Sequence, residues 1–207
     1  MNIGEIKRQA LQLIFPELEL SFDESDDTAT NEKIRALRCD PSLRGYLDAS
    51  VPAINRAISI IEAKGLSRTK QKQITVYGKI VNGGVMISQT GENGDIYLLK
   101  ETYQNGKKIA FEYKNGALIL FAKEGSVCDI VYKERVGRIY SFTQDSYELD
   151  LEREVAEIIP YFVKGEMQIS ENSECATSAF KHFYELLDML ASKEKAQNSV
   201  ESVYYLR

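Results

Sequence analysis

Four Asn-Gly pairs divide the middle of this chain into short pieces of similar length. They begin at Asn82, Asn93, Asn105 and Asn115, so successive pairs are 11, 12 and 10 residues apart. Asn-Gly is the strongest short signal for a tight β-hairpin turn, because both residues tolerate a positive φ. Between the pairs, apolar residues mostly alternate with polar ones, which is the period of a half-buried strand. This pattern predicts an antiparallel β-sandwich or small barrel.

Apolar residues on both sides of this block recur at helical spacing. Before it we expect helices over residues 3–14, 32–38 and 41–64, the last beginning at Asp40-Pro41 and ending at Gly65. After it we expect one helix over residues 151–163 and another over residues 176–190. The sequence therefore predicts an α+β protein. Residues 1–71 and 146–207 form a bundle of about four helices with a C-terminal arm, and residues 72–145 form the inserted β domain.

Prolines interrupt two of the expected helices. Pro160 deprives the Ala156 carbonyl of its donor, so the helix that begins with Asp150 as its N-cap should be kinked there. Pro52 occupies a similar position opposite the apolar face of the earlier helix. We expect two bent helices that lie against each other.

The composition is that of an ordinary globular protein. Of the 207 residues, 43% are hydrophobic and 28% are charged, and no apolar run reaches the roughly 20 residues of a membrane span. The first residues lack the pattern of a signal peptide, and three widely spaced cysteines indicate reduced thiols. No membrane partner is expected.

The acidic charge is concentrated in one segment. Residues 17–27 carry six carboxylates and no basic residue, which leaves 25 acidic against 26 basic residues elsewhere. Such a near-neutral remainder lacks the broad cationic surface of a DNA-binding protein, so no sequence-specific nucleic acid binding is expected. A basic hinge joins the helices to the strands and consists of Lys64, Arg68, Lys70 and Lys72. It is either a solvated linker or a partner for an acidic surface, such as residues 17–27 of another copy.

Enzyme chemistry has little support in this sequence. The single histidine, His182, faces away from the apolar stripe of its helix, where an ordinary solvated side chain is expected. Glu112 and Glu124 are the least unsuitable candidates for a glycosidase carboxylate pair, but we expect them to be solvated charges at strand ends. Asn82-Gly83-Gly84 lacks the Lys-Ser/Thr and the helix of a phosphate loop. We expect no enzyme activity, no metal and no cofactor.

Two surfaces could serve as binding sites. Tyrosines in the β block could stack on sugar rings or simply pack across strands, and they are Tyr77, Tyr97, Tyr103, Tyr113 and Tyr132. The chain ends on apolar residues after a polar tether over residues 193–199. We expect that this arm docks on a neighbour through Val203, Tyr204, Tyr205 and Leu206, with Val200 at its start.

Several short motifs resemble the head–tail connector (adaptor) proteins of tailed bacteriophages. They are Tyr-Glu-Leu-Asp-Leu at residues 147–151, Glu-Ile-Ile-Pro-Tyr-Phe at 157–162, Ala-Ile-Asn-Arg-Ala-Ile at 53–58, and the final helix over residues 180–190. The order of helices, inserted β domain and closing helical pair is also similar.

The resemblance implies a non-enzymatic virion protein at the head–tail junction, made in the host cytoplasm. Such subunits assemble as a ring, dodecameric by resemblance, that binds the portal protein, extends the DNA channel and docks tail proteins. An alternative is a β-sandwich module on a helical base that binds carbohydrate or a receptor. Glycan binding at the tyrosine-bearing strands would favour the alternative, and assembly that depends on the portal would favour the adaptor.

Overall fold

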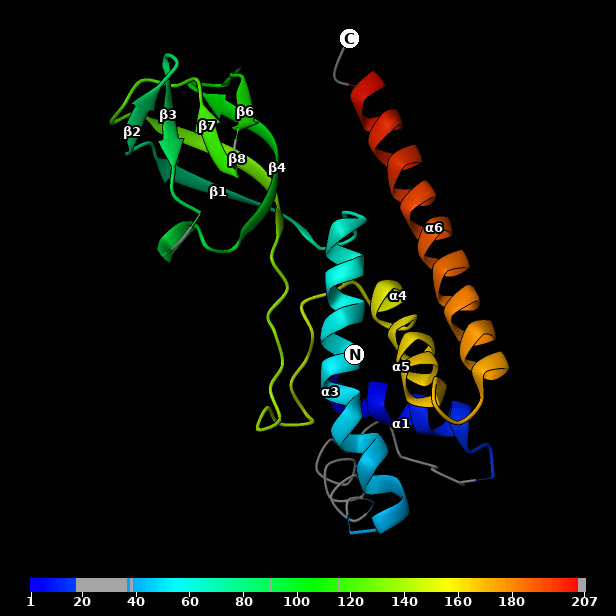
Figure 1. The fold of residues 1–207 in the computed structure, drawn as a ribbon. Helices are drawn as coiled ribbons and strands as arrows, with labels where there is room; N and C mark the ends of the chain where they lie inside the picture. The colour runs from blue at the N-terminus through cyan, green and yellow to red at the C-terminus, as the bar shows by residue number, and fades with distance from the viewer. Residues whose placement is uncertain (18–36, 38, 90, 115, 205–207) are drawn as a thin grey trace. The chain divides into compact units, whose positions relative to one another are not determined.

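The computed structural model describes residues 1–17, 37, 39–89, 91–114 and 116–204. The chain divides into two compact units (Figure 1). A helical unit combines Met1–Leu66 with Gly137–Arg207, and a β unit comprises Ser67–Val136. The predicted α+β class, a helical part with an inserted antiparallel sandwich, is confirmed.

The helices that precede the β unit start and stop at the signals in the sequence. Helix α1 (Ile3–Ile14) begins with a capping box between Asn2 and Glu5. Helix α3 (Pro41–Ala63) begins directly after Asp40 and contains Pro52. The helix ends two residues before Gly65, whose φ of 76° permits a terminal turn in which Leu66 N–H donates to the Ile61 carbonyl at 3.1 Å. The expected helix at 32–38 lies almost wholly outside the described residues.

The expected helix over residues 151–163 is two helices. Helix α4 (Arg153–Ala156) follows Glu152 as its N-cap, so the assignment of that role to Asp150 is wrong. Helix α5 (Ile159–Gln168) starts one residue before Pro160. Proline favours a first turn, where its missing N–H costs nothing, so Pro160 begins a new helix instead of kinking a continuous one.

The last helix is much longer than expected. Helix α6 (Ser173–Tyr204) continues through residues 193–199, which the sequence pattern had assigned to a flexible tether. Lys, Glu, Ala and Gln dominate that segment and are good helix formers, so a polar helix is compatible with its composition. Leu190 is its last buried residue among the side chains described as far as Ala196.

Helices α5 and α6 pack through aromatic rings. The Phe162 ring lies 5.0 Å from that of Phe183 and 5.2 Å from that of Phe180, measured between centroids. Gly165 allows this approach, because a Cβ there would lie 2.7 Å from a Phe180 ring carbon. Phe183 is wholly buried and Phe162 is 4% exposed. These rings form the centre of the helical core.

The β unit is a sandwich of two four-stranded antiparallel sheets. The first has the order β1 (Thr69–Thr75), β8 (Val127–Glu134), β4 (Ile96–Gln104) and β5 (Lys107–Lys108). The second has the order β2 (Lys79–Val81), β3 (Gly84–Ile87), β7 (Ala117–Leu120) and β6 (Phe111–Lys114). One core of alternating apolar residues joins the two sheets, including Ile74, Leu99 and Ile130 from the first and Val85 and Leu118 from the second.

Three of the four Asn-Gly pairs separate paired strands. Asn82-Gly83 and Asn105-Gly106 have positive φ at both residues, as the tightest hairpin turns require, and Gly116 also has a positive φ. Asn93-Gly94 differs, because a 3-10 helix (Gly91–Asn93) precedes Gly94 between β3 and β4. Those two strands belong to different sheets, so the chain crosses over there instead of turning back in a hairpin.

The ends of the β unit lie side by side. The Lys133 ammonium donates to the Ser67 carbonyl at 2.7 Å, and Glu134 N–H donates to the Arg68 carbonyl at 2.9 Å. The strands thus begin at Thr69, three residues before Lys72, where the sequence pattern placed the domain boundary. Residues 137–145, which that pattern assigned to the β domain, belong to the helical unit.

Candidate interaction surfaces

Among the described side chains of the helical unit, the most exposed aromatic group lies in the turn of a long loop. This loop, residues 137–149, runs from the end of the β unit to the segment before α4. Within the helical unit it makes a first leg along α3, a turn at residues 140–143, and a second leg along α1. We call residues 140–143 the aromatic turn.

Asn55 on α3 fixes the first leg. Its amide donates to the Ile139 carbonyl at 2.8 Å, and its side-chain oxygen accepts from Ile139 N–H at 3.0 Å. Arg138 adds a bond to the Asn55 carbonyl at 2.8 Å and an ion pair with Glu62 at 3.2 Å. Ile139 is only 2% exposed. The helical unit therefore holds Ile139 through its backbone N–H, its carbonyl and its buried side chain.

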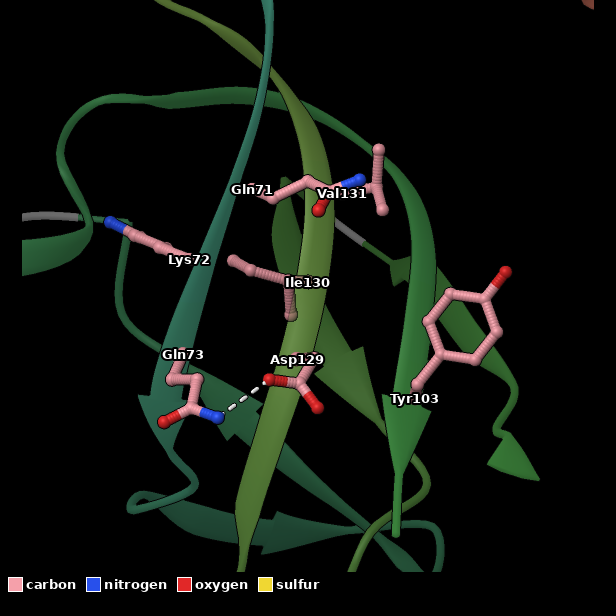
Figure 2. Close-up of a pocket in the computed structure, with 7 residues that line it drawn as sticks. All are labelled: Gln71, Lys72, Gln73, Tyr103, Asp129, Ile130 and Val131. Atoms are coloured by element: carbon pink, nitrogen blue, oxygen red, sulfur yellow. Dashed lines mark hydrogen bonds between the residues drawn. The ribbon is translucent and has the colours of Figure 1, made fainter. Parts of the chain in front are cut away.

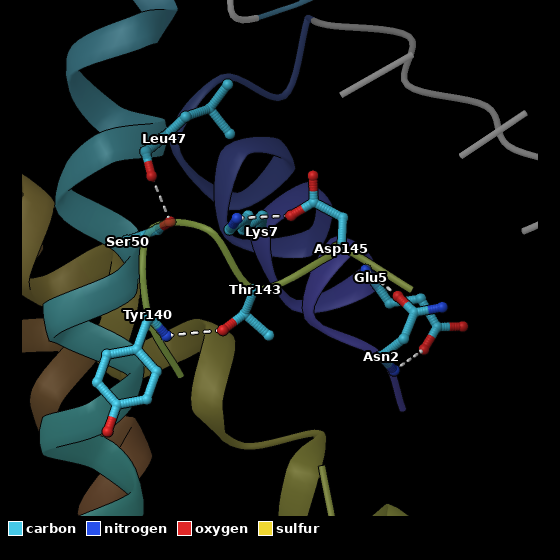
Figure 3. A network of polar contacts seen from close by, with 8 residues as sticks. All are labelled: Asn2, Glu5, Lys7, Leu47, Ser50, Tyr140, Thr143 and Asp145. Atoms are coloured by element: carbon cyan, nitrogen blue, oxygen red, sulfur yellow. Dashed lines mark hydrogen bonds and ion pairs between the residues drawn. The ribbon is translucent and has the colours of Figure 1, made fainter. Parts of the chain in front are cut away.

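The N-terminus of α1 fixes the second leg (Figure 3). The Lys7 ammonium lies 2.6 Å from an Asp145 carboxylate oxygen, and both side chains are largely buried. The backbone N–H groups of Ile3 and Gly4 donate to the carbonyls of Tyr147 and Asp145 at 3.0 and 2.8 Å. The first N–H groups of a helix lack partners within it, so the loop satisfies donors that α1 cannot satisfy itself.

Between these anchors the aromatic turn exposes two stacked rings. Tyr140 and Phe142 are 57% and 83% exposed, and their rings are nearly parallel at 5.3 Å between centroids. Thr143 closes the turn, because its hydroxyl accepts from Tyr140 N–H at 2.8 Å and its own N–H donates to the Tyr140 carbonyl at 3.0 Å. A turn that is held on both sides presents its rings with little conformational entropy left to lose on binding.

Sequence reasoning missed this surface, although a signal was present. Tyr140 and Phe142 are separated by one serine, and polar Thr143 and Gln144 follow them. Two aromatic residues with one residue between them suit either a strand or an exposed turn. The next alternate position, 144, is polar glutamine, which favours the turn. The role of Asn55 had no signal of its own, because its contact is 84 residues away in the sequence.

The predicted basic hinge does not present a set of free cations. Lys70 pairs with Glu134 at 2.6 Å and Lys72 with Asp95 at 2.5 Å, both inside the β unit. Lys64 belongs to the helical unit, where it pairs with Asp188 of α6 at 2.8 Å. Arg68 belongs to the β unit. The proposed partner, the acidic segment, lies outside the described residues apart from exposed Glu17.

The pair formed by Lys72 and Asp95 is part of a polar cluster in the β unit. The Tyr132 hydroxyl donates to the other Asp95 oxygen at 2.6 Å, and the Lys72 ammonium lies 5.2 Å from the centre of the Tyr132 ring. Burial alone would raise the pKa of Asp95, but the hydrogen bonds from Lys72 and Tyr132 outweigh it, so the pKa lies below its usual value. Burial and the Asp95 charge raise the pKa of Tyr132.

The predicted C-terminal arm is partly described. Val203 and Tyr204 are in the last turn of α6, whereas Tyr205 and Leu206 lie outside the described residues. Figure 1 shows α6 running on beyond α5 within the helical unit. The arm thus begins as a continuation of a helix and not after a flexible tether.

The candidate catalytic residues are placed as follows. His182 is exposed on α6, and its ring is nearly perpendicular to the Tyr161 ring, with 4.5 Å between the centroids. Glu112 is half-buried on β6, and Glu124 is exposed in the turn before β8. Among the described residues, no group of three or more His, Cys, Asp or Glu side chains is placed to hold a metal ion.

The five tyrosines of the β unit do not share one exposed platform. Tyr132 is 3% exposed, and Tyr77, which is 67% exposed, lies beyond the end of β1. The Tyr113 hydroxyl accepts from Leu99 N–H at 2.7 Å, and the Tyr103 hydroxyl donates to Glu101 at 2.7 Å. The Tyr97 ring lies against the Arg135 guanidinium, 5.6 Å away. Most of these rings are held individually by polar or charged neighbours.

Comparisons with family models and with curated proteins found no related sequence. The sequence matches no protein-family model, and it has no match among curated proteins. In the described part of the chain, no helix combines the length and the apolar character that crossing a bilayer requires.

Proposed function

We propose that this chain is a non-enzymatic structural subunit of a tailed-phage virion, an adaptor that forms a ring between portal and tail. In this role the ring extends the DNA channel and offers a docking surface to tail proteins. The proposal rests on the resemblance of the motifs at 53–58, 147–151, 157–162 and 180–190. It is supported by an α+β fold in which a helical unit formed by both ends of the chain carries an inserted sandwich.

The observation that carries the proposal furthest is the aromatic turn. Exposed Tyr140 and Phe142 are costly to leave in water, and aromatic residues fixed in this way are typical centres of protein interfaces. The ion pairs of Lys70 and Lys72 within their own unit make the basic hinge a weaker candidate for the contact between subunits. We therefore assign the contact with the neighbouring subunit to the aromatic turn.

The test is assembly with a candidate portal protein from a tailed phage. Mixed with that portal, the full-length protein should form rings visible by electron microscopy and a complex of high mass by light scattering. Replacing both Tyr140 and Phe142 by serine should abolish the rings while leaving the melting temperature nearly unchanged, because both side chains are exposed. The matched control is Tyr184→Ser, which removes an aromatic ring that is 43% exposed on α6.

Two outcomes would count against the proposal. A protein that stays monomeric with every candidate portal is not an adaptor ring. Rings that persist in the Tyr140→Ser, Phe142→Ser double variant would retain the adaptor function but remove the aromatic turn from the contact.

A further inference from the structure

A shallow cleft lies on the outward face of the first sheet of the β unit. Its volume is about 300 Å³, and side chains from β1, β8 and β4 line it (Figure 2). Strand register brings these side chains together, since Gln73 and Tyr103 both lie opposite Asp129, and Gln71 lies opposite Val131. Gln71, Gln73, Asp129 and Val131 share the outward face of neighbouring strands, where residues two apart point the same way, whereas Lys72 and Ile130 alternate to the other face.

The cleft offers hydrogen-bonding groups that are not used within the described part of the chain. The Gln73 amide donates to one Asp129 oxygen at 2.8 Å. This leaves the Gln73 carbonyl oxygen, the second Asp129 oxygen and the whole Gln71 amide without partners there. Carboxamides both donate and accept, and the carboxylate only accepts. A ligand that satisfies these donors and acceptors should carry several neighbouring groups that can both donate and accept hydrogen bonds. Vicinal hydroxyl groups meet this requirement.

Apolar surface lies next to these polar groups. Half-buried Val131 lies next to Gln71, and the Tyr103 ring stands on the neighbouring strand β4 (Figure 2). The Tyr103 hydroxyl is tied to Glu101, so the ring is held in place. A pyranose has C–H faces that pack on apolar and aromatic groups, while its rim of hydroxyls needs hydrogen-bond partners.

The charges in the cleft select against other ligands. The one cation of the lining, Lys72, is paired with Asp95 at 2.5 Å, and Asp129 leaves the outward face acidic. An anionic ligand such as phosphate would meet a carboxylate and no available ammonium. We propose that this cleft binds a neutral sugar through Gln71, Gln73 and Asp129, with the Tyr103 ring and Val131 against one face of the pyranose. This site is independent of the adaptor proposal.

The test uses the full-length chain and four probes, the methyl pyranosides of glucose, galactose, mannose and N-acetylglucosamine. Saturation-transfer NMR should detect binding of at least one probe, with a dissociation constant in the millimolar range as befits a shallow site for a single ring. Asp129→Ala should weaken that binding about tenfold, the loss expected for a hydrogen bond to a charged group. Gln71→Ala should also weaken it, and the fold should be unaffected because this amide has no partner in the described part of the chain.

The control variant is Thr75→Ala, an exposed position on the same face of β1 that lies opposite Val127, outside the cleft. It should bind like the original protein.

The proposal is overturned if no pyranoside binds, or if binding survives both Asp129→Ala and Gln71→Ala. It is also overturned if arginine amide, a cationic probe, binds in place of the sugars. Ring formation is measured separately and should be unchanged in Gln71→Ala, so the failure of one proposal leaves the other standing.

Discussion

Lys7 and Asp145 form an ion pair across 138 residues of sequence, with 2.6 Å between the ammonium and the carboxylate. The Lys7 side chain is 1% exposed and that of Asp145 is 13% exposed. Lysine is rarely buried without such a partner, because its charge loses most of its hydration. The pair joins α1 to the second leg of the loop that carries the aromatic turn.

Replacing Lys7 by alanine should therefore destabilise the protein strongly. It leaves the Asp145 carboxylate buried without its partner, for which about 3–5 kcal/mol is expected. The double variant Lys7→Met, Asp145→Leu should recover much of this loss, because no buried charge remains. Urea unfolding measures both. Arg44→Ala, which removes an exposed pair with Asp48, is the control and should cost no more than about 1 kcal/mol. Equal losses for Lys7→Ala and Arg44→Ala would contradict the assignment.

Asn55→Ala should loosen the first leg. The variant loses both hydrogen bonds to Ile139, and the cost should be about 1–3 kcal/mol because Ile139 is buried. Limited digestion with chymotrypsin offers a second measurement, since cleavage after Tyr140 or Phe142 should become faster. Ser59→Ala is the control one turn further along α3, where the hydroxyl is exposed and bonds only its own helix. Unchanged cleavage in Asn55→Ala would show that Asn55 does not hold the turn.

Truncation of the aromatic core should show coupling. Phe162→Ala and Phe183→Ala should each cost about 3–5 kcal/mol, since both rings are buried. Because the rings touch edge to face at 61°, the double variant should lose less than the sum, by about 0.5–1.5 kcal/mol. Tyr184→Ala, on the exposed side of α6, should cost much less. Strict additivity would mean that the two rings do not interact.

The cluster of Asp95, Lys72 and Tyr132 should make stability depend on pH at both extremes. The lowered pKa of Asp95 gives stability that is present above about pH 4, the ordinary carboxyl value, and is lost as the pH falls through the lower folded value. The raised pKa of Tyr132 makes stability depend on pH in the opposite direction. Unfolded tyrosine ionises near pH 10 while the folded one stays neutral, so stability falls as the pH rises above about 10.

Melting temperatures between pH 2 and pH 11 test this, with Tyr132→Phe as the variant. The phenylalanine cannot ionise or donate to Asp95, so the alkaline loss should shrink and the acid loss should diminish. Tyr77→Phe, which changes an exposed tyrosine, should follow the original protein. Identical pH profiles for all three proteins would exclude the cluster as the source.

Removing residues 200–207 should affect assembly more than folding. Leu190 is the last buried residue of α6 among the side chains described through Ala196, so the described end of the helix before the truncation adds no side chain to the core. The melting temperature should stay nearly constant while attachment to the portal or to neighbouring subunits falls. A melt that drops by many degrees would place the segment in the core of its own subunit.

Local signals predicted the β unit well because each acts within a few residues. Asn105-Gly106 needs only its own backbone preference to make a hairpin, and Ile74 and Ile130 show their burial by alternation. The same reasoning failed at Asn93-Gly94, where the connection depends on which sheet each strand joins. It failed at Pro160 because the missing N–H of proline is compatible both with a kink inside a helix and with the first turn of a new helix.

The candidate surface could not be read from the sequence for a different reason. The aromatic turn depends on Asn55 and Lys7, which are far from it in the chain and carry no motif. Lysine at position 7 has the pattern of a solvated residue, and only the fold places Asp145 beside it. The basic hinge was wrong in the opposite direction, because its lysines are paired and not free. Lys70 meets Glu134 when β1 pairs with β8, and Lys72 meets Asp95 only when β4 has joined the same sheet.

The divided helical unit has a consequence for the order of folding during synthesis. Helices α1 and α3 leave the ribosome first, but Phe162, Phe183 and Asp145 follow only after the entire β unit has been made. At about 5–20 residues per second, the buried faces of α1 and α3 must wait several seconds for their partners. The β unit has both ends together and its own core, so it can fold in that interval. It would then bring the two halves of the helical unit within reach of each other before the last helix is complete.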